Sequence, residues 1–217
     1  PDVITASSNL SGAVFRFTNQ FAGGGGFSSG TKLTVSDGNV NNVQAITVAD
    51  VLGDAAPDII TGGNDIQAFE NALDGSNEFS SRTTFSGASS TNALYATDLN
   101  GNSTPDILAA TDGGDTIEWF EGTSSEQDID TGFGNVESLL AAPIDTDSDN
   151  DILYANRANN TVGWIENGSV FFSTQASIST DAPSVQAVFA ADVDGDGDPD
   201  ALSATANDEV TGYENDV

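Results

Sequence analysis

The chain has 217 residues, with 34 acidic against 4 basic side chains and a formal net charge of −30. This balance argues against nucleic acid or an anionic membrane surface as a partner, because both require clustered Lys and Arg. The absence of Cys and His excludes disulfides and the Ser–His and Cys–His nucleophile systems. No apolar run approaches the ~20 residues of a membrane span, so we expect no membrane insertion. With 37% hydrophobic residues, the chain can still form a packed core.

Short β-type segments follow one another along the chain, and no stretch shows helical periodicity over the ~11 residues that would indicate a helix. The first unit predicts strands at residues 2–7, 13–17 and 31–35. The second predicts them at 43–49, 58–62, 66–70 and 80–85. The third predicts them at 93–97, 106–111, 116–121 and near 126–130. The fourth predicts them at 137–142, 151–156, 161–166 and 170–178, and the fifth at 185–191, 201–206 and 209–214.

An aspartate recurs at the start of the second strand of these units, at intervals of 45 to 56 residues. The five positions are Asp2, Asp58, Asp106, Asp151 and Asp200. Self-similarity at such a period indicates a repeated supersecondary unit. The predicted repeats cover residues 1–42 (partial), 43–91, 92–135, 136–184 and 185–217 (partial).

The loop at residues 192–200, DVDGDGDPD, has a carboxylate at every second position. They are Asp192, Asp194, Asp196, Asp198 and Asp200. Anions this close repel one another unless a cation lies among them, and Ca²⁺ accepts the irregular oxygen geometry of a short loop with glycine bends. The spacing begins like that of an EF-hand loop but lacks its bidentate Glu and its flanking helices. The sequence therefore predicts a calcium loop between two strands.

Three further loops repeat this pattern with fewer carboxylates. The candidate ligands are Asp145, Asp147, Asp149 and Asp151; Asp98, Asn100, Asn102 and Asp106; and Asp50, Asp54 and Asp58. Because Leu52 and Ala56 replace oxygen ligands in the loop at residues 50–58, we expect this loop to bind calcium most weakly and the loop at residues 192–200 most tightly.

The loop, the strand after it and the closing W-[FI]-E-[NG] or Y-E-N motif, as at residues 189–215, resemble the FG-GAP/VCBS-type repeats of integrin-like β-propellers. The resemblance covers essentially the whole chain. It implies an all-β propeller of four-stranded blades, with Ca²⁺ in the loop between the first two strands of a blade. It also implies that Asp192, Asp194, Asp196 and Asp200 bind the ion through their side chains and Asp198 through its backbone carbonyl.

The predicted strands number three, four, four, four and three, so the first and last blades are incomplete. Propellers usually close with ~4 to 8 blades, which protects their strand edges. We therefore expect either part of a longer propeller, seven-bladed as the resemblance suggests, or a chain completed by a neighbouring subunit. In the second case, strand addition or end-to-end packing at residues 2–7 and 209–214 gives filaments.

Large side chains recur at one position near the end of the third predicted strand: Phe17, Phe69, Phe120, Ile165 and Tyr213. Trp119 and Trp164 lie one residue earlier, on the opposite face. A ring of aromatics could stack on sugars, but we expect packing between blades. The asparagines that follow, Asn19, Asn71, Asn167 and Asn215, are interpreted as structural because Asn tolerates a left-handed turn.

Sequons for N-glycosylation occur at Asn9, Asn159 and Asn167, and also at Asn102, which is a candidate calcium ligand. Paired carboxylates could serve a glycosidase, but metal binding explains their spacing better. We therefore expect a non-enzymatic, secreted or cell-surface module that acts in adhesion or as a structural subunit of a filament or surface layer. The alternatives are a lectin-like glycan-binding module and an accessory domain of a secreted hydrolase.

Overall fold

The computed structural model describes residues 2–7, 13–20, 26–27, 31–33, 42–71, 79–85, 90–112, 115–122, 127–132, 134–168, 172 and 174–216. This part of the chain is all-β and contains no helix. Its strands are β1 (Val3–Ser7), β2 (Ala13–Phe17), β3 (Thr31–Leu33), β4 (Ala45–Ala49), β5 (Asp58–Gly62), β6 (Ile66–Asn71), β7 (Phe79–Phe85), β8 (Thr91–Thr97), β9 (Asp106–Thr111), β10 (Thr116–Phe120), β11 (Gln127–Thr131), β12 (Val136–Ala142), β13 (Asp151–Asn156), β14 (Thr161–Glu166), β15 (Thr174–Ser179), β16 (Val185–Ala191), β17 (Asp200–Thr205) and β18 (Val210–Tyr213).

The strands form five antiparallel sheets in which each strand pairs with its neighbour in sequence. Three sheets have four strands, β4–β7, β8–β11 and β12–β15, and two have three strands, β1–β3 and β16–β18. The predicted strands thus fall on observed ones, and the number per sheet is the predicted number within the described residues. Alternating and short apolar runs sufficed for this prediction because each sheet is built from local hairpins.

The second strand of each four-stranded sheet is buried along its whole length. Every residue of β5, β9 and β13 is buried, including the polar ends. Sheets whose two faces are both covered favour continuous runs of small and aliphatic side chains, as in DILAAT and DILYAN. These strands therefore form the middle of a stack.

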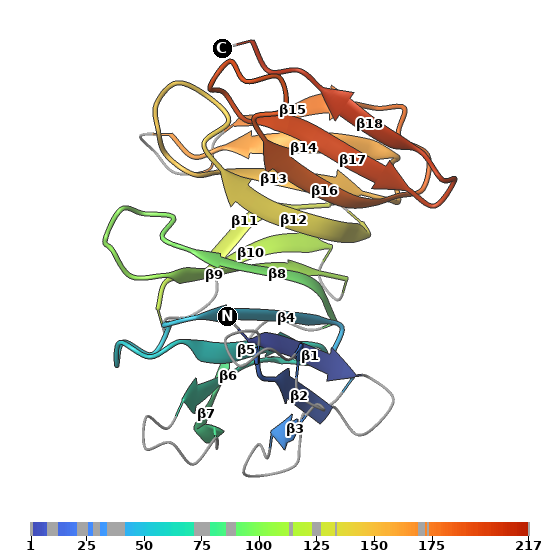
Figure 1. Cartoon of the computed structure of the whole chain (residues 1–217). Helices are drawn as coiled ribbons and strands as arrows, with labels where there is room; N and C mark the ends of the chain where they lie inside the picture. The colour runs from blue at the N-terminus through green and yellow to red at the C-terminus, as the bar shows by residue number, and fades with distance from the viewer. Residues whose placement is uncertain are drawn as a thin grey trace.

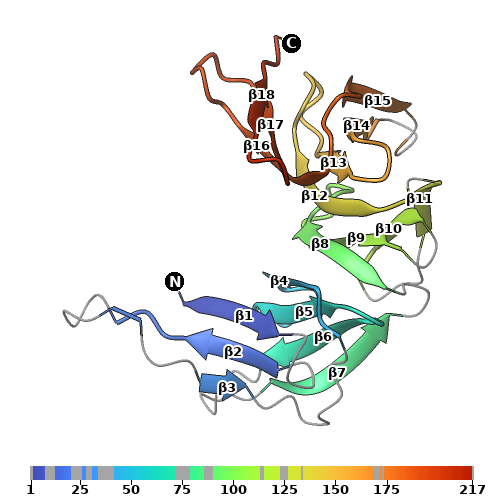
Figure 2. The same ribbon diagram turned by 90° about the vertical axis from the view of Figure 1, so that its right-hand side faces the viewer.

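The sheets pack face to face in chain order along a curved row, with the first and last sheets at its two ends (Figures 1 and 2). The first strands contact one another in sequence, β4 with β8, β8 with β12 and β12 with β16. Separate apolar clusters fill the spaces between neighbouring sheets. Trp119 belongs to the cluster toward β12–β15 and Phe120 to the cluster toward β4–β7, which confirms that these side chains lie on opposite faces of β10.

Close packing inside one sheet requires a glycine. A Cβ at Gly163 would lie 2.5 Å from the hydroxyl oxygen of Tyr154 and 2.8 Å from the carbonyl oxygen of Ala176. Tyr154 is 1% exposed and pairs directly with Gly163 across β13 and β14. The large ring therefore fits because its neighbour lacks a side chain.

Strand β1 corresponds to the second strand of the four-stranded sheets, such as β5. The Asp2 side chain accepts a hydrogen bond from the backbone N–H of Asn19 at 2.8 Å, as Asp58 does from Asn71 at 3.3 Å. Within the described residues β1 pairs with β2 alone and β18 with β17 alone, so each has one unpaired edge. Val3 and Val210 on these strands are exposed.

A search of the described residues finds no helix that is long and apolar enough to span a membrane.

Candidate metal centre

The acidic loops connect the first and second strands of four sheets, and those between β4 and β5 and between β8 and β9 project on the same side in Figure 1. Hydrogen bonds also link loops of adjacent sheets. The Asn150 side chain donates to the carbonyl oxygen of Asp98 at 3.2 Å. The repeat therefore arranges the candidate ligands along one edge of the stack.

The loop before β17 brings together three predicted ligands, Asp192, Asp194 and Asp200. One carboxylate oxygen from each lies within 4.8 Å of the other two. Hydrogen bonds donated by the backbone N–H groups of Val193 and Asn215 keep the pKa of Asp200 below its usual value, so this carboxylate is anionic at neutral pH. Asp192 and Asp194 are exposed and Asp200 is buried. Three anions at this separation favour a bound cation.

Glycines shape this loop around Asp192. The carboxylate of Asp192 accepts backbone N–H bonds from Gly195 at 2.6 Å and from Gly197 at 3.2 Å. These residues have φ values of 89° and 109°, which side chains rarely adopt. Asp194 and Asp196 accept from the N–H groups of Asp196 and Asp198. The N–H groups thus fold the acidic side chains inward, in a turn geometry typical of Asp.

The aspartate that ends each loop anchors it to the sheet. The Asp151 carboxylate accepts the N–H of Ile144 at 3.0 Å and that of Asn167 at 2.8 Å. Asp58 accepts from Val51 and Leu52 at the same place in its loop. Burial raises the pKa of Asp58 and Asp106, and raises that of Asp151 to about 6 against the lowering effect of these hydrogen bonds. A cation in the loop would oppose this shift by favouring the anion.

The loop before β9 uses amides in place of carboxylates. The Oδ1 atoms of Asn100 and Asn102 accept N–H bonds within the loop, while their Nδ2 atoms donate to Oε1 of Glu121 at 3.0 and 3.3 Å. Glu121 is an additional residue of the site that the sequence did not predict. The signal for it is the glutamate that repeats in the closing W-[FI]-E-[NG] motif after the third strand. By accepting from both Nδ2 atoms it holds the amide oxygens toward the loop.

The remaining predicted ligands lie in the expected loops. Asp50 and Asp54 accept backbone N–H bonds within the loop before β5, and Asp145 and Asp147 do so in the loop before β13. Asp149 and Asp196 are exposed, and Asp198 is half-buried. Among the described residues, Asp192, Asp194 and Asp200 form the cluster of three acids whose oxygens lie within 4.8 Å of one another. The other ligand assignments stay predictions.

The asparagines after the third strands clamp adjacent repeats. Asn167 Nδ2 donates to the carbonyl oxygens of Leu99, in the preceding repeat, and of Asn150. Asn215 Nδ2 donates in the same way to Ile144 and Pro199. Asn71, Asn167 and Asn215 are not among the described residues with positive φ, so the expected left-handed turn is wrong. The side-chain amide, rather than the backbone conformation, explains the residue type.

This clamp also corrects one predicted glycosylation site. Asn167 is 3% exposed and its side-chain nitrogen is hydrogen-bonded, so the folded chain offers no accessible acceptor there. Asn159 is exposed in the turn after β13. Asn9 lies outside the described residues.

The donor chemistry of the loops fits Ca²⁺. The candidate ligands are carboxylate and amide oxygens with no nitrogen or sulfur ligand, and hard divalent cations prefer such oxygens. The three-acid cluster provides charge for the ion, and the inward-folded turns provide a rigid frame. The residues of the loop before β17 therefore fit a bound Ca²⁺.

Several solved structures share this fold. The chain aligns over 99% of its length with a lectin from Agrocybe aegerita that recognises non-reducing terminal N-acetylglucosamine, at a TM-score of 0.58 and 16% identity. It aligns over 99% with the V. cholerae biofilm matrix protein Bap1, at a TM-score of 0.59 and 19% identity. It aligns over 98% with an auxiliary nutrient binding protein from Bacteroides ovatus, at a TM-score of 0.62 and 9% identity.

The chain spans 66%, 34% and 54% of the length of these three structures, less than two thirds in each. Comparison with curated protein sequences finds no match. Residues 144–203, which include the loops before β13 and β17 and the strands between them, match the family model of the FG-GAP-like repeat. The FG-GAP-type repeat inferred from the loop and the closing motif is thus confirmed over this segment.

Proposed function

We propose that the chain is a calcium-stabilised β-propeller module of an extracellular protein and that it acts by binding or assembly. The observation that carries this proposal is the convergence of Asp192, Asp194 and Asp200 in the loop of an FG-GAP-like repeat. An extracellular setting is supported by the acidic composition and the likeness to a lectin and a biofilm matrix protein.

The propeller assignment rests on the curved row of sheets and on the sequential contacts of their first strands. In a propeller these are the innermost strands, and closure requires the row to return on itself. The unpaired edges of β1 and β18 offer backbone groups to which a further strand of the same sheet could pair. A strand from the same protein or from a second copy would complete each sheet.

Adhesion or a structural role is favoured over catalysis. The charged groups of the site are explained by loop folding and by cation binding, which leaves no acid–base pair assigned to a reaction. A lectin-like role is the second candidate, supported by the A. aegerita lectin with the same fold. An accessory domain of a secreted hydrolase is the third, since binding modules of this kind serve many proteins.

Calorimetric titration with calcium tests the metal site directly. We expect saturable binding, with at least one site lost in Asp192→Ala. Asp181→Ala, at an exposed acid in the turn before β16, is the matched control and should keep all sites. Absence of saturable binding, or equal loss in both variants, would contradict the proposal.

Electron microscopy of the purified chain in calcium tests the assembly role. Filaments or sheets that disappear in Thr211→Pro would support strand addition at β18, because proline removes a backbone donor. A folded monomer at high concentration would refute self-assembly. Binding of the monomer to a glycan array would then favour the lectin-like role.

A further inference from the structure

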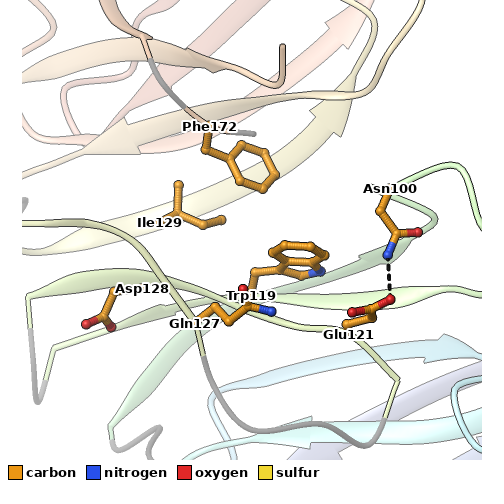
Figure 3. Close-up of a pocket in the computed structure, with 7 residues that line it drawn as sticks. All are labelled: Asn100, Trp119, Glu121, Gln127, Asp128, Ile129 and Phe172. Carbon is orange, nitrogen blue, oxygen red and sulfur yellow. Dashed lines mark hydrogen bonds between the residues drawn. The ribbon is translucent and has the colours of Figure 1, made fainter. Parts of the chain in front are cut away.

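Two pockets lie at equivalent places between neighbouring sheets. The first has a volume of about 390 Å³, lies beside β10 and is lined by Asn100, Trp119, Glu121 and Phe172 among others (Figure 3). The second has a volume of about 250 Å³, and Asp145, Trp164 and Tyr213 are among its lining residues. The only two tryptophans of the chain thus each line a pocket. Each also lies two residues before the glutamate of the closing motif, which is Glu121 after Trp119 and Glu166 after Trp164.

The first pocket is closed over its tryptophan. Phe172 meets the Trp119 ring edge to face, with centroids 5.9 Å apart and planes at 74°, as the orientation of the two rings in Figure 3 shows. Trp119 is only 5% exposed. Trp164 in the second pocket remains partly exposed, beside the partly exposed Tyr213. Of the two tryptophans, Trp164 is therefore the one that a ligand can reach, and the second pocket is named the Trp164 pocket.

Two carboxylates border the Trp164 pocket, and its other side-chain polar groups are the indole N–H of Trp164, the hydroxyl of Tyr213 and the amide of Asn215. Asp145 comes from the loop before β13 and Glu214 from the end of β18, so carboxylates from two repeats border one space. The side-chain nitrogen of Asn215 is already used, since it donates to the carbonyl oxygens of Ile144 at 2.8 Å and Pro199 at 3.2 Å. None of its described lining residues is Lys or Arg.

The apolar part of the pocket continues below these carboxylates. Ile178 of β15 and the buried Ala201 of β17 line it together with Trp164. An aliphatic stem with a head that donates hydrogen bonds and carries positive charge would match both parts of this lining. An anionic ligand would be repelled by the two carboxylates, whereas binding of a neutral sugar is an outcome that the test below distinguishes.

We propose that the Trp164 pocket binds the side chain of a lysine presented by a basic partner protein. An ammonium group has three donors and no acceptor, which matches the two carboxylates of Asp145 and Glu214. Its alkyl chain packs on apolar surface, and aromatic faces attract cations. The net charge of −30 steers basic partners toward the molecule. Asp145 is also a candidate calcium ligand, whereas Trp164 and Glu214 are not, so tests at these two residues keep the lysine proposal separate from the metal proposal.

Fluorine NMR of the full chain labelled with 5-fluorotryptophan tests this assignment, with Trp164→Phe used to identify the Trp164 signal. The probes are Nα-acetyl-lysine methylamide and its Nε-acetylated analogue, which keeps the stem and loses the charge. We expect a saturable shift of the Trp164 signal with the first probe alone, while Trp119 serves as internal reference. No shift, or equal shifts with the neutral probe or with glucose, would overturn the proposal.

Two charge-matched variants separate a specific contact from general attraction. Glu214→Gln should raise the Kd for the lysine probe about two- to fivefold, as expected for an exposed ion pair. Glu209→Gln removes the same charge from an exposed residue outside the pocket lining and should leave the Kd unchanged. Equal effects of both variants would show attraction by net charge only and contradict the pocket. Because Trp164 and Glu214 are not candidate calcium ligands, this result and that of the calcium titration are measured at different residues.

Discussion

At the end of β14, Asn167 joins three segments of the chain through one residue. Its side-chain nitrogen donates hydrogen bonds to two carbonyl oxygens. One belongs to Leu99 in the loop of the preceding repeat, at 2.7 Å, and the other to Asn150. Its backbone N–H holds Asp151. Because both side-chain bonds are buried or partly buried, loss of the amide leaves carbonyl groups without a donor, which costs more than a surface contact.

We expect Asn167→Ala to lower the free energy of unfolding by about 1–3 kcal/mol. The control is Asn159→Ala, an exposed turn residue, for which the change should stay within about 0.5 kcal/mol. Urea unfolding in calcium measures both. If the two variants had similar free energies of unfolding, the hydrogen bonds of Asn167 between repeats would not contribute to stability.

Glu118 is a second residue with an unusual environment. It is 3% exposed within β10, and its Oε1 accepts hydrogen bonds from the hydroxyls of Thr111 and Thr116 at 2.8 Å. Its Oε2 has no partner among the described residues. Burial raises the pKa of Glu118, the two hydroxyls lower it and Asp128 raises it, with a net upward shift.

A raised pKa in the folded state means that the folded chain binds this proton more tightly than the unfolded chain. The stabilising contribution is present below the unfolded pKa and is lost as the pH rises through the folded value. Glu118→Gln should therefore gain stability relative to the parent between about pH 4 and pH 7, measured as the difference in urea midpoints. If the difference in urea midpoint between Glu118→Gln and the parent did not change with pH, the pKa of Glu118 would not be raised in the folded chain.

At the scale of the elements, local sequence explains the strands and loops. Apolar runs such as DILYAN mark strands that are buried on both faces, and glycines at positions 195 and 197 mark a turn with positive φ. The clamps could not be predicted, because Asn167 and Leu99 lie 68 residues apart in sequence. The burial of Glu118 could not be predicted either, because charged side chains are usually exposed. The Trp164 pocket could not be predicted because it forms between two packed sheets.

The loops differ in the charge they offer to a cation. Asp194 and Asp54 make the same local contact, since each carboxylate accepts the N–H of the residue two positions later, at 3.1 and 2.9 Å. The two substitutions therefore remove the same turn contact. Only Asp194 belongs to the three-acid cluster.

Asp194→Ala should reduce the calcium stoichiometry and the calcium-dependent stability more than Asp54→Ala does, because calcium affinity follows ligand number and charge. Calorimetric titration of both variants, with melting in saturating calcium, measures the difference. An equal or larger loss in Asp54→Ala would reverse the order of the sites.

At the scale of the molecule, charge and architecture are coupled. The row of sheets places its acidic loops on one edge, where hydrogen bonds from Asn150, Asn167 and Asn215 tie the loops before β9 and β13 to the next sheet. Cations bound there would reduce repulsion and fix the spacing of the sheets together. The net charge of −30 makes this contribution large at low ionic strength.

Thermal unfolding in calcium and in chelator, at matched ionic strength, tests this account most directly. A ligand that binds only the folded state adds about 2.7 kcal/mol per site at one hundred times its dissociation constant. We therefore expect a clearly higher midpoint in calcium than in magnesium or chelator, since the irregular loops suit the larger ion. An unchanged midpoint in calcium would contradict the account.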